Sequence, residues 1–155
     1  MLIRTFKVGD EPVLRSVFYS SVHDLTGGQY SSEQQFAWAP LDYDQTTWAD
    51  RIRGIQPFLV EIDGVVAGYS DLQPSGYIDH FYVAGAFANH GVGRALMNHI
   101  HSTAKLLQIN ELWSKVSLTA EPFFSKYGFH VEERSEFLLR GVKMFNATMR
   151  KSLLT

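Results

Sequence analysis

The stretch FYVAGAFANHGVGRALM, residues 81–97, decides the fold prediction because it joins the end of an apolar strand to the start of a long helix. Gly91 and Gly93 lie where that helix begins, although glycine is a poor helix former. The first amides of a helix have no partner within it and carry a partial positive charge. Glycines would leave those amides uncovered, so the stretch predicts either a phosphate-binding loop or a loop that merely turns the chain.

Two other phosphate-binding motifs fit the stretch less well. A Walker A loop has Gly-Lys-Ser/Thr, whereas Gly93 is followed by Arg94 and Ala95. A dinucleotide-binding fingerprint requires a third glycine at the position that Leu96 occupies. The loop of residues 84–90 is also long for a Rossmann turn, so neither motif is favoured.

Periodicity and turn signals on both sides of this stretch predict a mixed α/β (α+β) fold in one domain of residues 1–155. The sheet should be mostly antiparallel because hairpin turns are predicted at residues 63–64 and 140–141. The long helix should form a right-handed crossover between parallel strands. The expected strands are residues 2–6, 58–62, 65–72, 77–83, 112–118, 129–139 and 142–149. The expected helices begin near residues 10, 31, 44, 91 and 119 and end near residues 27, 40, 52, 108 and 128. Residues 31–35 offer a capping pattern for the second helix, and Thr119 can cap the last one. The apolar face of the long helix should comprise Val92, Ala95, Leu96, Ile100, Thr103 and Leu107.

The composition fits one globular domain with a sizeable core, since the chain has 155 residues of which 45% are hydrophobic. The formal net charge of -2 gives no overall field that would attract nucleic acid. The chain has no cysteine, which excludes disulfides, thiolate nucleophiles and cysteine-based zinc sites. Residues 1–12 contain no long apolar run, so we expect no signal peptide, no membrane span and a cytoplasmic location.

Two segments taken together resemble the GNAT superfamily of acyl-CoA-dependent N-acyltransferases: FYVAGAFANHGVGRALM, residues 81–97, and AEPFFSKYGF, residues 120–129. The first is similar to the family's pyrophosphate-binding motif, usually Arg/Gln-x-x-Gly-x-Gly/Ala a short distance after a strand that ends in valine. The second is similar to a later helix that usually ends in an aromatic residue, a short spacer and Gly-Phe. Their separation fits the family, and so does the order of elements over nearly the whole chain.

The resemblance implies a site for acetyl-CoA and a central pair of strands that splays apart. The amides of residues 89–95 would hold the pyrophosphate, and Phe81 and Val83 would offer backbone groups to the pantetheine arm, as a strand adds to a sheet edge. This arrangement requires residues 77–83 to diverge from residues 112–118. The cofactor-binding residues implied in this way are Phe81, Tyr82, Val83, Ala88, Asn89, His90, Gly91, Val92, Gly93, Arg94, Ala95, Phe123 and Tyr127.

The chain departs from the family pattern at two positions. Ala88 stands where the family has arginine or glutamine, which should weaken the phosphate cradle without abolishing it, because amides do most of the binding. Phe124 stands where many relatives have a tyrosine that protonates the leaving thiolate, and phenylalanine cannot donate a proton. Tyr127, one helical turn later, is the candidate substitute acid, or else an aromatic that packs against the core or the cofactor.

Asp79 is the candidate general base, because relatives often carry the base on the strand that enters the loop. Strand alternation places Asp79 on the same face as Phe81 and places His80 on the opposite face. The other interpretation of Asp79 is a carboxylate at a strand start that pairs with a nearby cation. Glu61 and Asp71, on the preceding hairpin, are further candidates for the base.

The N-terminal third should shape the acceptor site, as it does in the family that the chain resembles. Aromatic rings and carboxylates suit an amine, but inward packing of the aromatics explains the same pattern. His99 and His101 lie two positions apart on a helix and do not share a face, which argues against a metal site. The candidate substrate-binding residues are Tyr30, Trp38, Tyr77 and Asp79, with Gln34, Asp42 and Asp44 noted beside them.

The function implied is transfer of an acetyl group from acetyl-CoA to a primary amine of a small molecule or peptide, by direct attack without a covalent enzyme intermediate. The alternative is a non-catalytic acyl-CoA-binding regulatory module, which Phe124 keeps open. Neither nucleic acid, nor a membrane, nor a metal is expected as a partner. The closing hairpin could pair between subunits, so a homodimer is open as well, and the sequence does not identify the amine.

Overall fold

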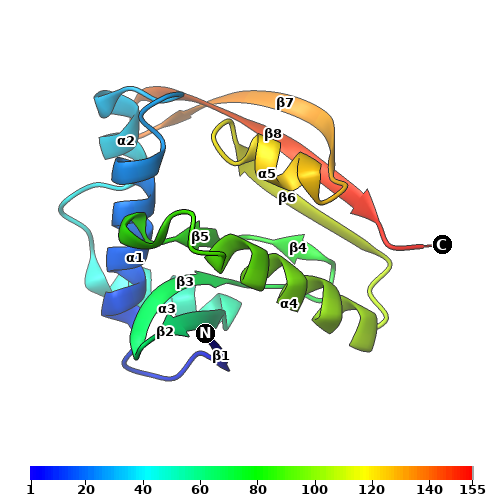
Figure 1. The fold of residues 1–155 in the computed structure, drawn as a ribbon. Coiled ribbons are helices and arrows are strands. Elements are labelled where there is room, and N and C mark those ends of the chain that lie inside the picture. Colours follow the sequence, from blue (N-terminus) through cyan, green and yellow to red (C-terminus); the bar gives the residue numbers. More distant parts are fainter. Residues whose placement is uncertain (155) are drawn as a thin grey trace.

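Two four-stranded sheets diverge from one another in the computed structural model, which describes residues 1–154 (Figure 1). The first sheet has the order β1 (Leu2–Thr5), β2 (Phe58–Ile62), β3 (Val65–Ser70), β5 (Phe81–Val83). The second has the order β4 (Tyr77–Ile78), β6 (Glu111–Ser117), β8 (Val142–Ser152), β7 (His130–Leu139). Neighbouring strands are antiparallel except for the parallel pair β4 and β6, so the predicted mixed, mostly antiparallel fold is confirmed.

The expected strand of residues 77–83 is divided between the two sheets. β4 pairs in parallel with β6, whereas β5 pairs antiparallel with β3. Between them the backbone amides of Asp79 and His80 both donate to one carboxylate oxygen of Asp71, at 2.9 and 2.7 Å. Within residues 1–154 no ladder joins β5 to β6, so the predicted divergence of these strands is confirmed.

Helices cover both faces of the first sheet (Figure 1). Leu59 and Tyr69 face α1 and α3, while Val60 and Ala67 face α4, because side chains alternate along β2 and β3. None of the helices within residues 1–154 is both long and apolar enough to span a membrane. The helices are α1 (Glu11–Leu25), α2 (Ser32–Trp38), α3 (Gln45–Ile55), the 3-10 turn η1 (Gly85–Phe87), α4 (Val92–Leu106) and α5 (Glu121–Lys126).

Local sequence signals predicted most helix ends correctly, but the N-cap residue of α5 differs from the predicted one. Ser31 and Gln34 form the expected capping box at the start of α2, with the Gln34 amide 3.1 Å from the Ser31 hydroxyl. The expectation that Thr119 caps α5 is wrong, because Ala120 is the N-cap residue. The Thr119 hydroxyl instead donates to the side-chain oxygen of Gln29 at 2.7 Å.

The buried face of α4 also differs from the prediction at its end. Val92, Leu96 and Met97 are 0–1% exposed and pack in the core beneath β2 and β3. Leu107, predicted to complete this face, is 62% exposed. The helix ends at Leu106, one residue before Leu107, and Gln108 takes a left-handed φ of 55° that turns the chain away from the helix axis.

Candidate active site

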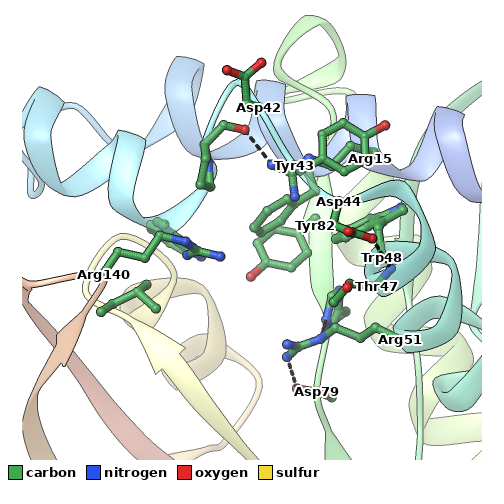
Figure 2. A pocket seen from close by; sticks show the side chains of 15 residues that line it. Arg15, Asp42, Tyr43, Asp44, Thr47, Trp48, Arg51, Asp79, Tyr82 and Arg140 are labelled. Carbon is green, nitrogen blue, oxygen red and sulfur yellow. Dashed lines mark hydrogen bonds and ion pairs between the residues drawn. The ribbon is translucent and has the colours of Figure 1, made fainter.

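Tyr82, on β5, stands between two cavities that lie where the two sheets diverge. The smaller cavity has a volume of about 210 Å³ and is lined by α1, β5, the start of α4 and the segment from β6 to α5; we call it the apolar slot. The larger cavity has a volume of about 530 Å³ and is lined by α1, the α2–α3 loop, α3, the start of β5 and the β7–β8 turn; we call it the polar cavity (Figure 2). Tyr82 and Trp38 line both of them.

The apolar slot brings together residues that the sequence predicted to bind the cofactor. Its walls include three strand residues and two residues from the helices beyond, namely Phe81, Tyr82, Val83, Gly93 and Phe123. Phe81 and Phe123 lie ring against ring, with 5.6 Å between centroids. The slot is therefore a narrow apolar channel between β5 and α5.

The backbone of β5 has one free edge. On the side of β3, the His80 carbonyl accepts a hydrogen bond at 3.2 Å and the Ala84 amide donates one at 2.8 Å. Because successive residues of a strand direct their backbone groups to opposite sides, those of Phe81 and Val83 point away from β3. Within residues 1–154 no strand pairs with that edge, so a ligand in the slot can hydrogen-bond to it as an added strand would.

The start of α4 carries backbone amides that have no protein partner. Asn89 and Gly91 have left-handed φ angles of 61° and 80°, which turn the chain into the helix. The first helical bond runs from the Ala95 amide to the Gly91 carbonyl at 3.0 Å, so Ala95 drops out of the predicted set of free amides. The amides of residues 89–94 have no acceptor among residues 1–154. This helix end therefore presents several donors together with the positive end of the helix dipole.

The two glycines that open this helix serve different purposes. Gly91 has a positive φ, which glycine adopts most readily, and a Cβ there would make only an ordinary contact, 3.9 Å from the end of the Met1 side chain. A Cβ at Gly93 would lie 3.2 Å from the Phe123 ring, so this glycine lets α4 approach α5. Helix packing explains the glycine at position 93. The expectation that a glycine leaves room for a ligand therefore remains for Gly91 alone. In the preceding loop, the His90 ring nitrogen lies 2.8 Å from the Ala88 carbonyl.

Asp79 lies in the polar cavity beside Arg51, with 3.5 Å between a carboxylate oxygen and Nη2 (Figure 2). Strand alternation predicts Asp79 on the face of Phe81 and His80 on the opposite face. That prediction is wrong, because Asp79 and His80 both line the polar cavity while Phe81 lines the apolar slot. The alternation fails because Asp71 draws both backbone amides to a single oxygen, which interrupts the strand.

His80 is 4% exposed, and its ring holds Arg51 in position. Its Nε2 accepts a hydrogen bond from Arg51 Nε at 3.1 Å, which places the ring proton on Nδ1, 2.9 Å from the Tyr69 hydroxyl. Burial lowers the pKa of His80 to about 4, so the ring is neutral at neutral pH. Tyr69, His80, Arg51 and Asp79 thus form one chain of polar contacts that ends in the cavity.

Asp71 and Glu61, the further candidates for the base, line neither cavity. Asp71 is fully buried, and burial raises its pKa to about 6, although its hydrogen bonds to backbone amides and to the Gln73 side chain oppose the rise. Glu61, on β2, forms an ion pair with Arg4 on the neighbouring edge strand β1. Asp71 therefore shapes the backbone at Asp79, and Glu61 has a structural partner.

Two of the four residues predicted to bind the acceptor, Trp38 and Asp79, line the polar cavity, whereas Tyr30 and Tyr77 line neither cavity. The Tyr30 hydroxyl donates to the carbonyl of residue 145 at 2.7 Å and accepts from the amide of residue 118 at 3.0 Å. Tyr77 stacks on Trp113, with 4.3 Å between ring centroids, and its hydroxyl donates to Asp79 at 3.5 Å. Tyr30 therefore joins the N-terminal helices to the second sheet.

Phe124, in α5, and Tyr127, the residue that follows this helix, both pack against the ring of Phe123. Phe124 is 2% exposed and packs on Phe129 and Phe81, with 5.0 and 5.3 Å between ring centroids. Tyr127 packs on Phe123, with 4.9 Å between centroids, and does not line the apolar slot. The helix therefore presents Phe123, which has no ionisable group, to the slot.

Three arginines line the polar cavity, namely Arg15, Arg51 and Arg140, and sequence reasoning placed none of them in the acceptor site, although it allowed Arg140 to meet a small polyanion. They come from α1, α3 and the β7–β8 turn, so no spacing along the sequence connects them. Arg15 has the clearest local signal, because it follows Leu14 in the apolar stripe of α1 and is only 8% exposed. A cation on the buried side of a helix is rare without a function or a partner.

Comparison with known proteins gives a consistent result. The family description "Acetyltransferase (GNAT) domain" matches residues 28–153 of this chain. An uncharacterized N-acetyltransferase of Escherichia coli (strain K12), YafP, is 28% identical over 148 residues, which cover 96% of this chain and 93% of that protein.

Solved structures agree with the sequence matches. A GCN5-related N-acetyltransferase from Rhodopseudomonas palustris is 30% identical, with a TM-score of 0.92, over 98% of this chain and 95% of that chain. The PaiA N-acetyltransferase from Thermoplasma acidophilum, solved in complex with coenzyme A, is 18% identical, with a TM-score of 0.74, over 97% of this chain and 98% of that chain. At that identity the PaiA structure is evidence of a shared fold.

Proposed function

The chain belongs to the GNAT family of acetyltransferases, and from this premise we propose that it transfers an acetyl group from acetyl-CoA to a primary amine of a small molecule or peptide. The observation that carries the proposal is the junction at Tyr82, where an apolar slot with a free strand edge adjoins a polar cavity that contains a carboxylate. In this arrangement one cavity would hold the cofactor and the other the amine, with Tyr82 in the lining of both.

The residues around the apolar slot suit acetyl-CoA. The amides of residues 89–94 are free donors at a helix N-terminus, which is a favourable place for a pyrophosphate. The free edge of β5 at Phe81 and Val83 suits the amide groups of a pantetheine arm, and the apolar walls suit its methylene groups. The coenzyme A complex of the PaiA relative supports the same choice of ligand.

The chain's own groups can support direct transfer. Acetyl-CoA supplies the acetyl group as a thioester, so a carbon–nitrogen bond forms as the carbon–sulfur bond breaks. Asp79 accepts the proton that the amine loses, directly or through one water molecule. A backbone amide on the free edge of β5 donates to the carbonyl oxygen as negative charge develops there.

The leaving thiolate needs no side-chain acid in this proposal. Phe124 is buried and cannot donate a proton, and Phe123 rather than Tyr127 lines the slot. A coenzyme A thiol has a pKa of about 8.5 by analogy with cysteine, so it can leave as the thiolate. The acid role predicted for Tyr127 stays a prediction, which the exchange Tyr127→Phe tests.

Release of free thiol from acetyl-CoA on addition of amines is the measurement that tests the function. A transferase releases thiol in an amine-dependent way with at least one member of a broad panel of amines. A regulatory module would bind acetyl-CoA, detected by a thermal shift, and release no thiol with any amine. That second result would replace the catalytic proposal by the binding one.

A further inference from the structure

Arg15 is a buried cation whose guanidinium faces the polar cavity. It is 8% exposed, and one of its nitrogens, Nη2, donates to the Pro40 carbonyl at 2.6 Å. Every fully buried side-chain nitrogen or oxygen within residues 1–154 has a hydrogen-bond partner. The other two nitrogens of Arg15 have no such partner among those residues, so they are open to the cavity that the side chain lines.

Aromatic rings hold this guanidinium in place. Arg15 lies over the ring of Tyr43, 4.2 Å from its centroid, and 5.2 Å from the centroids of Phe18 and Trp48. These contacts fix the position of the group and leave its charge without a counter-ion. The free nitrogens are therefore presented to the cavity in a preorganised geometry.

Arg140 brings a second cation to the same cavity from the tip of the β7–β8 hairpin. Its Nη1 donates to the Ala37 carbonyl at 2.6 Å, and Figure 2 shows its guanidinium directed into the cavity toward Tyr82. Among residues 1–154, no carboxylate lies within ion-pair distance of Arg15 or Arg140. Burial lowers the pKa of Arg15, and the like charge of Arg140 acts in the same direction.

The carboxylates that line the cavity are engaged or directed elsewhere. Asp44 caps α3 by accepting from the Thr47 amide at 2.8 Å, and Asp79 pairs with Arg51 at 3.5 Å. Figure 2 shows the carboxylate of Asp42 directed away from the guanidinium groups. A cation as buried as Arg15 costs free energy that a bound anion would recover, and the exposed Arg140 adds a second positive charge to the same cavity.

We propose that the acceptor carries an anionic group, a carboxylate or a phosphate, in addition to its amine, and that Arg15 and Arg140 bind this group. The proposal rests on the transferase function proposed above and names its class of substrate. Guanidinium groups match the planar geometry of carboxylate and phosphate oxygens, so two of them can clamp one such group. In Figure 2, Asp79 lies at the lower edge of the cavity and Arg15 at the upper edge, which leaves the amine of the acceptor near Asp79.

Matched acceptors test the proposal by thiol release from acetyl-CoA. One arm uses amines with a free carboxylate, a second uses amines with a phosphate monoester, and a third uses the uncharged ester or amide of the same amines. We expect kcat/KM to be at least about tenfold higher for one of the anionic arms, as expected for one charge-assisted contact. The arm that is preferred identifies the anion.

Variants assign the preference to the two arginines. Arg140→Gln should lower kcat/KM for the anionic acceptors about tenfold or more, mainly through KM, and leave the uncharged acceptors nearly unchanged. Arg134→Gln is the matched control, because Arg134 lies on the same hairpin, pairs with Glu121 on the surface and lines neither cavity. Arg15→Gln should show the same selective loss, and Arg140→Gln carries the test alone if the buried variant does not fold.

Equal turnover of charged and uncharged acceptors, unaffected by Arg140→Gln, would overturn the proposal and leave the transferase function intact. If no amine releases thiol, the proposed transferase function is wrong. Anion binding then tests whether Arg15 and Arg140 form an anion site. Inorganic phosphate and succinate, at constant ionic strength and with saturating coenzyme A to occupy the amides of residues 89–94, should then raise the melting temperature of the wild type and of Arg134→Gln but not of Arg140→Gln. Equal shifts in all three proteins would overturn it.

Discussion

The carboxylate of Asp79 has two polar neighbours, Arg51 and Tyr77, and its chemistry depends on how firmly they hold it. The Arg51 guanidinium lies 3.5 Å from its oxygen, and the Tyr77 hydroxyl donates to it at the same distance. Both contacts are long, so neither holds the carboxylate as firmly as a bidentate ion pair would. The arrangement leaves room for an ammonium group or a water molecule beside Asp79.

We expect Asp79→Asn to lower kcat about 100-fold at neutral pH, because an amide cannot accept the proton of the amine. The acid limb of the pH–rate profile should disappear in the same variant. Asp50→Asn, an exposed change on the neighbouring α3, is the control and should keep the wild-type profile. A wild-type profile in Asp79→Asn would show that another group, or solvent, removes the proton.

Gly91 lies in the loop before α4 and has a backbone conformation that favours glycine. Gly91→Val forces a β-branched side chain into a φ of 80°, at a cost of about 1–2 kcal/mol in the free energy of unfolding. The strain should also displace the adjacent amides and weaken coenzyme A binding about tenfold or more, measured by calorimetry. Gly91→Asn is the control, since asparagine tolerates this backbone conformation better. Unchanged affinity in the valine variant would remove the amides of this loop from the binding site.

Tyr127→Phe tests whether the residue that follows α5 supplies an acid. Because Tyr127 packs on Phe123 and does not line the slot, we expect kcat to change by less than about threefold, a difference well below the usual size of an acid–base contribution. Steady-state thiol release with a good acceptor measures it. A loss of tenfold or more, with coenzyme A affinity intact, would instead establish the acid role predicted for Tyr127.

At the scale of elements, the break between β4 and β5 depends on one buried carboxylate. Asp71 holds the amides of Asp79 and His80, and burial raises its pKa from 3.8 to about 6. The folded state therefore binds this proton more tightly than the unfolded state, so Asp71 makes the protein more stable as the pH falls from about 6 to about 4. His80 acts in the opposite direction, because its pKa of about 4 lies below 6.5 and the unfolded state takes up its proton first.

Asp71→Asn removes the contribution of Asp71 and keeps an oxygen that can accept the two amides. We compare the free energy of unfolding of the variant with that of the wild type at each pH. The difference, variant minus wild type, should fall by about 2–3 kcal/mol between pH 7 and pH 4, because only the wild type gains stability when Asp71 takes up its proton. Urea unfolding at pH 4, 5, 6 and 7 measures it. A difference between the two proteins that stays constant with pH would show that Asp71 does not titrate in this window.

Local sequence signals predicted the elements well and the site only in part. The capping box at Ser31 and the two-residue turns of the hairpins depend on neighbouring residues, and the structure has them as predicted. The break at Asp79 depends on Asp71, eight residues away, so strand alternation could not predict it. The polar cavity depends on Arg15, Arg51 and Arg140, which only the tertiary fold brings together.

For the whole molecule, the divergence of the two sheets leaves the slot without backbone pairing across it. A ligand that pairs with the free edge of β5 should therefore stabilise the fold as a missing strand would. We expect acetyl-CoA at about 100 times its Kd to add about 2.7 kcal/mol and raise Tm by about 5–10 °C. Amide hydrogen exchange should slow at Phe81 and Val83, with β1 as the internal control. Equal slowing in β1, or none at either residue, would contradict binding along β5.

Tyr82 and Trp38 belong to both cavities, so the two binding equilibria share a wall. Burial raises the pKa of Tyr82 to about 12, and its uncharged phenol can contact either ligand without a change of protonation. Any shift of these rings that one ligand causes alters the affinity for the other. Thermodynamic linkage makes that influence reciprocal: the factor by which acetyl-CoA changes the affinity for the amine is the factor by which the amine changes the affinity for acetyl-CoA.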